Sequence, residues 1–428
     1  MKKALIITYY WPPAGGPGVQ RWLKFVKYLK DFDIKPVIYI PENPHYPITD
    51  NTLVDEIPKG IKILKQPINE PYGFSKLFFK KKTQAISSGV ITQKKPSLIE
   101  KLMLFVRGNF FIPDARVGWV KPSVKFLQDY LKENPVDVII TTGPPHSLHL
   151  IGMNLKNSTQ TPWIADFRDP WTSIGYHKKL KLTKTSQQKH LKLEKEVLQT
   201  ADRIIVTSPA TQKEFEAITP KPLEVITNGF DVEISTEKVL DEKFSIAHIG
   251  SLLSERNPVS LWKVLSELID ENSDFNKDFR LKLAGVVSSD VLESIKNLNL
   301  SNHLVEMGYL SHKESVALQR KAQVLLLIEI DSPETKAIIP GKIFEYLAAK
   351  RPILSVGPEG SVIEEILEQT QAGKFFNSFN ENELKTYILE LYQKFKSGSL
   401  VLNSKNIEQF SRKNLTKKLA EVINNTVS

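Results

Sequence analysis

The sequence contains no cysteine among its 428 residues. This lack excludes disulfide bonds, thiolate metal sites and cysteine nucleophiles together. Long hydrophobic runs are also missing: the apolar run at residues 324–328 is far shorter than the roughly 18 residues that span a bilayer. The apolar start at residues 4–11 ends at Pro12 and Pro13, which predicts a strand rather than a signal peptide. We therefore expect a cytoplasmic protein that is at most peripheral to the inner face of a membrane.

The residues that are present are typical of a globular protein. Hydrophobic residues make up 41% and charged residues 25%, and 58 Lys and Arg exceed 48 Asp and Glu to give a net charge of +10. The length predicts two or three domains of about 100 to 200 residues each. The positive charge favours anionic partners such as nucleotides or phospholipid head groups. Because the lysines are spread along helices without a nucleic-acid recognition module, we expect no nucleic-acid partner.

Short apolar runs alternate with stretches of helical periodicity, which predicts β-α-β units and parallel sheets. We expect strands at residues 4–9, 37–40, 136–141, 163–166, 203–207 and 223–226, and again at residues 244–249, 279–283, 324–328 and 352–356. The fold class indicated is α/β, with two doubly wound, Rossmann-like domains that face a cleft. The expected boundaries are an N-terminal domain at 1–230, a linker at 231–243, a C-terminal domain at 244–404, and a helix at 405–428 that packs back on the N-terminal domain.

One basic segment interrupts this alternation. Residues 74–101 combine many lysines with Phe78 and Phe79. A basic insertion that carries aromatic residues can bind an anionic membrane surface. The alternative is a solvated loop followed by a surface helix.

A glycine turn follows the first expected strand. Gly15 and Gly16 allow the backbone to approach a ligand closely, and the next helix offers free N-terminal amides to a phosphate or a sugar. The spacing is not G-x-G-x-x-G, so no dinucleotide fingerprint is indicated. The alternative is a tight, proline-rich turn between a strand and a helix.

Polar residues follow two other expected strands of the first half, at the sheet edge where open α/β sheets bind ligands. His146 could donate to a phosphate or act on charge at a reaction centre, although a lone histidine is more often structural. Asp166 and Asp169 surround Arg168, and this group suits sugar hydroxyls or an acceptor; the alternative is an internal salt-bridge cluster. Their spacing is not D-x-D and no histidine ligand adjoins them, so we expect no metal ion.

In the second half, Gly250 follows a strand and Arg256 lies near the next helix start. A cation and free backbone amides at such a place can hold a diphosphate. Lys342 follows Gly341 at the beginning of a later helix, and Glu345 lies three residues on, on the same face. Lys342 could bind phosphate and Glu345 could accept ribose hydroxyls, while the alternative is a surface ion pair.

Taken together, these stretches resemble glycosyltransferases of the GT-B fold, especially family 4 of the retaining, nucleotide-sugar-dependent enzymes. The resemblance covers nearly the whole chain. It rests on the early glycine loop, residues 228–231, Gly250 with Arg256, residues 308–310, and the block at 342–352.

The resemblance implies that the N-terminal domain binds the acceptor and the C-terminal domain binds the nucleotide sugar, without a cofactor. It implies that Arg256 and Lys342 contact the diphosphate and that Glu345 contacts the ribose. Catalytic roles are assigned to His146, which matches the position that approaches the donor sugar, and to Asp169. The substrate-binding residues expected in full are Gly15, Gly16, Asp166, Arg168, Gly250, Ser251, Arg256, Tyr309, Leu310, Gly341, Lys342 and Glu345, with the loop at 308–310 on the base.

Two positions depart from the family pattern. The family carries a sugar-contacting glutamate eight positions before Glu345, and here that position is Ala337. Ser251 stands where the family often has arginine. The group that replaces the missing glutamate is left open within residues 332–341.

The expected function is transfer of a sugar from a nucleotide diphosphate sugar to a saccharide or lipid-linked acceptor, in cell-surface polysaccharide synthesis. One alternative is a nucleotide-binding protein of the same fold that has lost catalysis, as Ala337 and Ser251 suggest. Another is a nucleotide-sugar epimerase, which would need no acceptor. An anionic membrane surface is the further expected partner.

Overall fold

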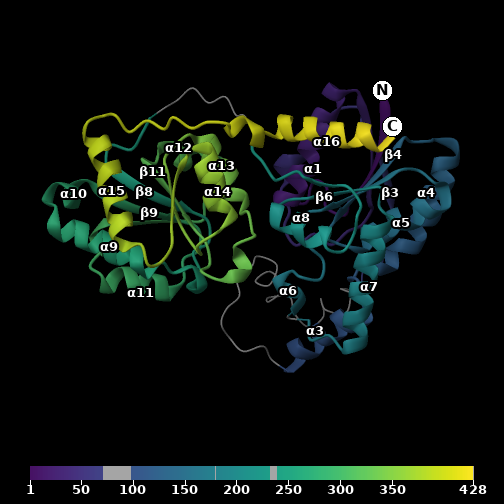
Figure 1. Cartoon of the computed structure of the whole chain (residues 1–428), viewed down its shortest axis with the longest axis horizontal. Coiled ribbons are helices and arrows are strands. Elements are labelled where there is room, and N and C mark those ends of the chain that lie inside the picture. Colours follow the sequence, from purple (N-terminus) through teal and green to yellow (C-terminus); the bar gives the residue numbers. More distant parts are fainter. Residues whose placement is uncertain (71–97, 179, 232–238, 428) are drawn as a thin grey trace. The chain divides into compact units, whose positions relative to one another are not determined.

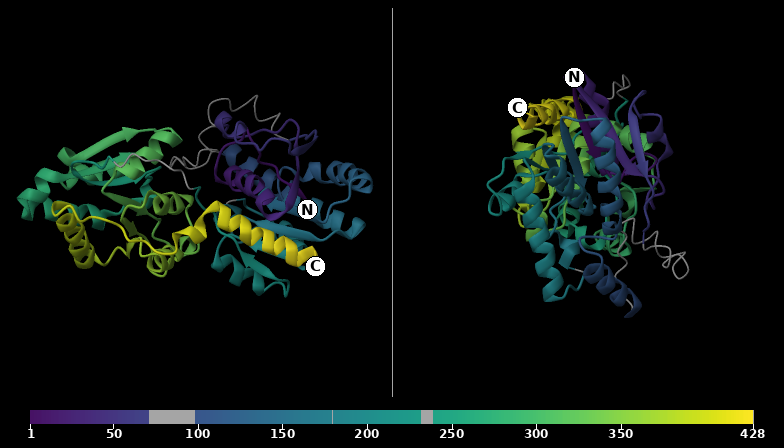
Figure 2. Two further views of the ribbon diagram at one scale, coloured as in Figure 1. Left: turned by 90° about the horizontal axis from the view of Figure 1, so that it is seen from above. Right: turned by 90° about the vertical axis from the view of Figure 1, so that its right-hand side faces the viewer.

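The computed structural model describes residues 1–70, 98–178, 180–231 and 239–427 of the chain. Two compact units are present: unit 1 contains residues 1–228 and 412–428, and unit 2 contains residues 229–411. In each unit helices lie on both sides of a sheet (Figures 1 and 2). No helix in the described ranges is long and apolar enough to cross a membrane. The basic segment expected at residues 74–101 lies outside the described residues except for its end, which begins helix α3 (Leu98–Phe110).

The sheet of unit 1 has seven parallel strands in the order β3-β2-β1-β4-β5-β6-β7. These are β1 (Lys2–Ile7), β2 (Ile34–Pro41), β3 (Lys62–Gln66), β4 (Val138–Gly143), β5 (Trp163–Phe167), β6 (Arg203–Val206) and β7 (Leu223–Val225). Leu5 of β1 pairs with Val37 of β2 and with Ile139 of β4. All residues of β4 are buried, as in a parallel strand covered on both faces.

Helices cover both faces of this sheet because successive side chains of each strand point to opposite faces. Leu5 and Ile7 pack in one cluster with Trp119, while Ala4 and Ile6 pack in another with Trp22. Besides α3, the described helices of unit 1 are α1 (Pro17–Tyr28), α4 (Val120–Glu133), α5 (Ser147–Thr159), α6 (Gly175–Lys178), α7 (Lys184–Thr200), α8 (Pro209–Glu216) and α16 (Arg412–Val427). The short 3-10 helices are η1 (Leu29–Phe32), η2 (Asn51–Val54) and η4 (Val117–Trp119).

The last helix, α16, belongs to unit 1 although the chain passes through unit 2 before reaching it. Leu415, Leu419, Val422 and Ile423 recur at helical spacing and are buried. They join the cluster that contains Trp22, so α16 lies beside α1 (Figure 1).

The sheet of unit 2 has six parallel strands in the order β10-β9-β8-β11-β12-β13. These are β8 (Phe244–Ile249), β9 (Phe279–Ala284), β10 (Leu304–Gly308), β11 (Val324–Ile328), β12 (Ile353–Val356) and β13 (Gly373–Phe376). The helices are α9 (Val259–Glu271), α10 (Ser273–Asp278), α11 (Ser289–Asn297), α12 (His312–Lys321), α13 (Gly341–Ala349), α14 (Val362–Thr370) and α15 (Glu381–Lys396). The short 3-10 helices are η5 (Ser254–Arg256), η6 (Ser301–His303), η7 (Pro333–Thr335) and η8 (Ile407–Phe410).

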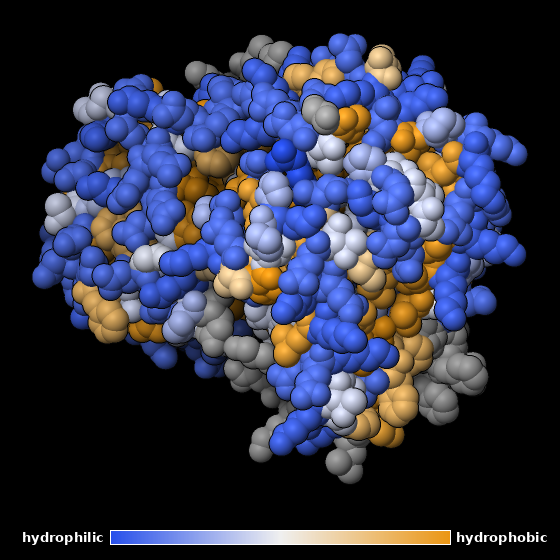
Figure 3. Space-filling view, turned by 45° about the vertical axis from the view of Figure 1, so that its right-hand side comes forward, coloured by the Kyte–Doolittle hydropathy of each residue, from blue (hydrophilic) through white to orange (hydrophobic). Residues whose placement is uncertain are grey.

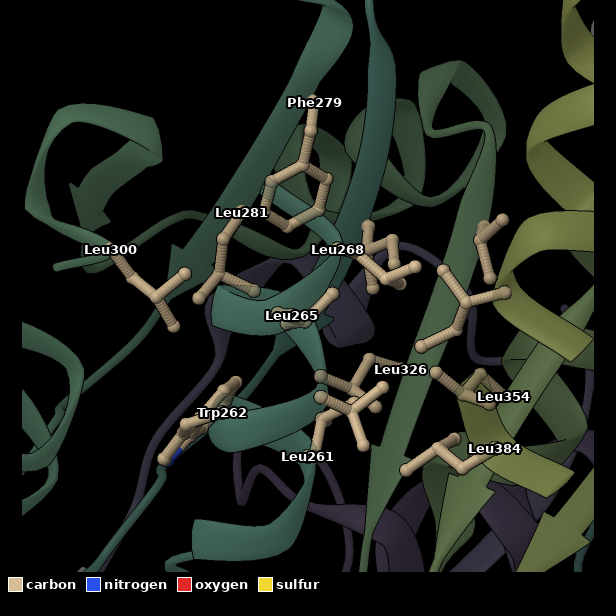
Figure 4. Packing of buried hydrophobic residues seen from close by; sticks show 14 of the residues in the cluster. Leu261, Trp262, Leu265, Leu268, Phe279, Leu281, Leu300, Leu326, Leu354 and Leu384 are labelled. Carbon is tan, nitrogen blue, oxygen red and sulfur yellow. The ribbon is translucent and has the colours of Figure 1, made fainter. Parts of the chain in front are cut away.

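In the core of unit 2, leucines at helical spacing on α9 pack against those strand residues that point to the same face of the sheet. Figure 4 shows Leu261, Leu265 and Leu268 of α9 packing toward Leu281 of β9 and Leu326 of β11. This layer is fully buried and fixes the strand ends that carry the polar residues described below.

The expected α/β fold class with two doubly wound domains is confirmed by these two parallel sheets. Each of the ten expected strands is present, with ends that differ by at most a few residues. The strands β3, β10 and β13 were not expected, and all three are edge strands. Their residues are partly exposed, as in Lys62 and Lys65 of β3, so the continuous apolar run that marked the inner strands is lacking.

Candidate functional site

Both sheets have a point where the strand order reverses, and open α/β sheets bind ligands there, beyond the carboxyl ends of the strands. In unit 1 this point lies between β1 and β4, and in unit 2 it lies between β8 and β11. The glycine turn at Gly15 and Gly16 follows β1, and His146 follows β4. Gly250 follows β8, and Glu329 follows β11 directly. Each unit therefore has polar or glycine residues at the position favoured for a ligand.

Gly250 forms a turn that a larger residue would not fit. Its φ of 127° is one that side chains rarely adopt, and a Cβ there would lie 2.7 Å from Nζ of Lys342. The carbonyl oxygen of Gly250 is also within 2.6 Å of the place where a Cβ of Gly285 would lie. The turn after β8 thus allows the Lys342 amine to lie directly against the backbone.

Arg256 and Glu329 form a pair in unit 2. The Nη2 atom of Arg256 lies 3.8 Å from Oε2 of Glu329, and the Glu329 side chain is 3% exposed while that of Arg256 is 30% exposed. Among the described residues, the buried Nε of Arg256 has no hydrogen-bond partner. Burial raises the pKa of the Glu329 carboxyl, and the positive charges of Arg256 and Lys342 act in the opposite direction.

Glu329 is a candidate ligand-binding residue that the sequence analysis missed. The search for the absent family glutamate was confined to residues 332–341, whereas Glu329 lies earlier, immediately after the buried strand β11. A charged residue at the end of an entirely apolar run was the signal that could have identified it. We refer to Arg256, Lys342, Glu329 and His248 as the Lys342 cluster.

Lys342 is the second residue of α13, after Gly341, and no acidic residue lies in the first turn of this helix. The N-terminus of α13 also has no side-chain cap, so its free amides add to the positive potential there. Burial lowers the pKa of Lys342 to about 8, and the charge of Arg256 contributes in the same direction.

His248 is the fourth residue of the cluster and lies next to the Lys342 amine. It is fully buried on β8, and its Nε2 lies 3.5 Å from Nζ of Lys342. Its Nδ1 lies 3.0 Å from the carbonyl oxygen of Leu326, which accepts a hydrogen bond when Nδ1 is protonated. Burial and the neighbouring Lys342 charge hold the pKa of His248 well below its ordinary value. The ring is therefore neutral, and Nε2 can accept a hydrogen bond from Lys342.

Of the other expected residues of unit 2, Ser251 lies next to the cluster, Glu345 is held by another group and Tyr309 lies farther away. Glu345 accepts a hydrogen bond of 2.8 Å from Nε2 of Gln319 on α12. Ser251 is half-buried beside Gly250. Tyr309 is 89% exposed and precedes Leu310 in the loop after β10, an edge strand separated from β8 by β9. The structure therefore groups Gly250, Arg256, Gly341 and Lys342, and it places the 308–310 loop two strands from β8.

In unit 1, the glycine turn leads directly into α1. Gly16 has a φ of 102° and is the N-cap residue, and α1 has no acidic residue in its first turn. A Cβ on Gly18 would overlap the guanidinium of Arg168, and a Cβ on Gly15 would lie 3.0 Å from Cγ2 of Ile48. Arg168 thus lies against the first turn of α1, and its Nη2 donates to the carbonyl oxygen of Pro144. Three expected residues, Gly15, Gly16 and Arg168, are brought together at this turn.

His146 precedes α5 and is only 3% exposed. Its ring stacks on Trp171 at 5.1 Å between centroids, and neither ring nitrogen has a hydrogen-bond partner among the described residues. Burial, with the nearby charges of His149 and Arg168, holds its pKa well below the ordinary value. A neutral imidazole with two free nitrogens can donate one hydrogen bond and accept another, which keeps His146 a candidate.

Asp166 is turned into the protein. It is fully buried on β5, its Oδ1 lies 3.1 Å from Nη2 of Arg21, and its Oδ2 accepts a hydrogen bond of 2.8 Å from Nε1 of Trp22. Arg21 also donates to the carbonyl oxygen of Thr227 at 2.6 Å. This arrangement favours the internal salt bridge that the sequence left open, although the partner is Arg21 of α1 and not the neighbouring Arg168.

Asp169 lies at the same sheet edge. Burial raises the pKa of its carboxyl, and the Arg168 charge opposes this.

A different acidic pair, Asp31 and Asp33, has the D-x-D spacing that the sequence analysis sought around Asp166. It lies at η1, before the amino end of β2 and away from the strand ends described above, and Asp31 pairs with Lys413 at 3.4 Å.

Comparisons with known proteins agree with this architecture. Residues 87–234 match the model of Glycosyltransferase Family 4. A search of curated proteins gave no match. A TarM variant from S. aureus, solved with fondaparinux, alpha-GlcNAc-glycerol and UDP, is similar with a TM-score of 0.58 and 12% identity, over 99% of this chain and 100% of that one. The lipopolysaccharide outer core galactosyltransferase WaaB has a TM-score of 0.57 and 14% identity, over 100% and 99% of the chains.

The chain therefore has the GT-B fold, and its resemblance to family 4 glycosyltransferases is confirmed. The family match at residues 87–234 supports glycosyl transfer as the class of activity. The fold is also found in a Listeria monocytogenes protein described as a UDP-N-acetylglucosamine 2-epimerase, which has a TM-score of 0.55 and 12% identity over 98% and 95% of the chains. Identities this low show the fold alone.

Proposed function

We propose that the protein transfers a sugar from a nucleotide diphosphate sugar to a saccharide or lipid-linked acceptor in cell-surface polysaccharide synthesis. The observation that carries the proposal is the Lys342 cluster at the point of strand reversal in unit 2. Two cations, an uncapped helix N-terminus and a glycine turn meet there. This is the combination that binds a diphosphate.

The charge balance of the cluster favours an anionic ligand. Within the cluster, Glu329 pairs with Arg256, while the charges of Glu329 and of Glu345 both act on Lys342. Among the described residues, the buried Nε of Arg256 has no partner and can donate to a ligand. A diphosphate would bring further negative charge beside both cations and raise the pKa of Lys342 toward its ordinary value. The same cations would stabilise the negative charge that develops on the leaving diphosphate.

For the acceptor we propose the corresponding edge of unit 1, beside Arg168, His146 and Asp169. Arg168 supplies a cation, and the neutral His146 supplies two nitrogens that have no hydrogen-bond partner in the part of the chain that the structure describes. The carboxyl of Asp169, with its raised pKa, is suited to accept a proton from an acceptor hydroxyl. Retention of the anomeric configuration is part of the proposal and rests on the family resemblance alone.

We further propose that the reaction needs no metal ion, because Arg256 and Lys342 occupy the place where a divalent cation would neutralise a diphosphate. Arg168 and the α1 N-terminus could hold an anionic group of the acceptor in the same way.

The test begins with a thermal-shift screen of nucleotides and nucleotide sugars, because a ligand that binds only the folded state raises the melting temperature. The donor selected by this screen is then labelled in its sugar and incubated with saccharide and lipid-linked acceptors. Label in an acceptor product is the expected result. Conversion of the donor without an acceptor would indicate an epimerase instead, and binding without turnover would indicate a non-catalytic nucleotide-binding protein.

A further inference from the structure

Helix α3 of unit 1 presents its apolar side chains outward. Leu102, Met103, Val106 and Phe110 are 61%, 43%, 37% and 72% exposed. Leu102, Val106 and Phe110 follow one another at intervals of four residues, so they lie along one face of the helix, with Met103 beside them. In a surface helix of a globular protein this face would normally be polar.

The last turn of α3 is fixed to the rest of unit 1. Gly108 is buried, and a Cβ there would lie 2.7 Å from Cδ2 of Leu182. Asn109 donates to the carbonyl oxygen of Lys181 at 3.3 Å and accepts from the amide of Thr183 at 2.8 Å. The helix therefore cannot turn its apolar face inward without losing these contacts. Hydrophobic side chains gather on the lower end of the molecule in Figure 3, where Figure 1 draws α3 and the start of α7.

The surroundings of this face are basic. Residues 101–113 contain Lys101 and Arg107 and no acidic residue, and residues 170–193 contain six lysines and no acidic residue. The acids that follow these two stretches are engaged within unit 1: Asp114 accepts hydrogen bonds from Ser147, and Glu194, 1% exposed, accepts from Thr172. Within the sequence of α3, Glu100 in the first turn is the one acidic residue.

An apolar helix face bordered by cations matches the chemistry of an anionic lipid surface, because the apolar side chains enter the acyl boundary while the lysines meet the head groups. We propose that the outward face of α3 binds anionic bilayers, with Leu102, Val106 and Phe110 inserted and Arg107, Lys181 and Lys184 on the head groups. This assigns a membrane-binding element within the described residues, independently of the donor and acceptor.

Flotation with vesicles tests the proposal. The protein is mixed with vesicles of phosphatidylcholine alone or of phosphatidylcholine with phosphatidylglycerol, at low and high salt. We expect binding to the anionic vesicles, loss of binding at high salt, and a fall of about tenfold or more in partition for Phe110→Glu. Phe379→Glu is the matched control, since Phe379 is 89% exposed in unit 2, and it should bind as the wild type does.

A site-specific probe separates insertion from electrostatic adsorption. Because the chain has no cysteine, Val106→Cys and Phe379→Cys each provide a single labelling site for an environment-sensitive fluorophore. The label at position 106 should shift to shorter wavelength on anionic vesicles, and the label at position 379 should not.

Three results would overturn the proposal. The first is a lack of binding to anionic vesicles at low salt, and the second is equal binding by Phe110→Glu and the wild type. The third is a wild-type dimer that Phe110→Glu converts to a monomer without vesicle binding, which would make this face an interface between two copies. None of these measurements uses a sugar substrate, so their failure is distinct from failure of the proposed transferase activity.

Discussion

The lowered pKa of Lys342 should make the affinity for a nucleoside diphosphate depend on pH. Burial and Arg256 lower this pKa from 10.5 to about 8 in the free protein. A diphosphate binds the protonated amine and raises its pKa again, so binding takes up a proton when the pH exceeds about 8. Affinity is therefore full below this pH and falls above it. From about pH 7 to about pH 9 the protonated fraction of the free protein falls about tenfold, which corresponds to about 1.4 kcal/mol.

Calorimetric titration with the nucleoside diphosphate selected by thermal shift measures this decline, and the matching nucleoside serves as the ligand control. Lys342→Arg is the control variant, because a guanidinium stays protonated across this range. The terminal phosphate completes its ionisation near pH 6, below the range in question. His248 is neutral throughout because its pKa lies well below its ordinary value. Ionisation of Glu329, whose pKa is raised by burial, would also weaken diphosphate binding as the pH rises. Lys342→Arg retains Glu329, so a decline caused by Glu329 would remain in that variant.

The expected result is a decline of about tenfold in the wild type, a flat profile in Lys342→Arg, and no decline for the nucleoside. Titrations in buffers of different ionisation heat should report uptake of a fraction of a proton near the pKa and close to one proton above it. A decline of equal size in Lys342→Arg would refute the assignment of the titrating group. A flat wild-type profile would show that the diphosphate does not bind against this amine.

Three further outcomes follow from the structure. Arg256→Ala should weaken diphosphate binding by about 1.5 to 3 kcal/mol and nucleoside binding much less, by calorimetry, and an equal loss for both ligands would contradict a phosphate contact. Asp166→Asn should lower the free energy of unfolding, measured by urea titration, by about 3 to 5 kcal/mol, because Arg21 would be left as an unpaired buried charge. The control is Asp129→Asn, which removes one partner of an exposed ion pair and should change this free energy little. Transfer should survive EDTA, and a complete loss that manganese restores would contradict the metal-free proposal.

The inner strands could be predicted from the sequence because burial on both faces requires continuous apolar runs. Residues 244–249 and 324–328 were expected as strands with the bounds that β8 and β11 have. The edge strands β3, β10 and β13 escaped because exposed positions in them carry lysine or glutamate, whereas the edge strand β7 was expected at residues 223–226. Their pattern therefore does not differ from that of a loop.

Position at the sheet edge was predictable for the candidate site, whereas the direction of each side chain was not. Gly250, Lys342 and His146 lie at the strand ends and helix starts where the sequence placed them. The distance between Gly250 and Lys342, which the glycine makes possible, depends on two segments about ninety residues apart in the chain. The order of the strands in the sheet brings such segments together, and a local sequence pattern carries no information about that order.

Asp166 and Glu329 show how much depends on these distant partners. Each is a buried acid at the carboxyl end of an inner strand, Asp166 as the fourth residue of β5 and Glu329 directly after β11. Asp166 has both oxygens occupied by Arg21 and Trp22 of α1, so it fixes that helix to the sheet. Glu329 lies 3.8 Å from Arg256, whose Nε has no partner among the residues that the structure describes, so that pair can open to another anion. The tightness of the partner contact, and not the residue type, therefore separates a structural carboxylate from one that can exchange its partner for a ligand.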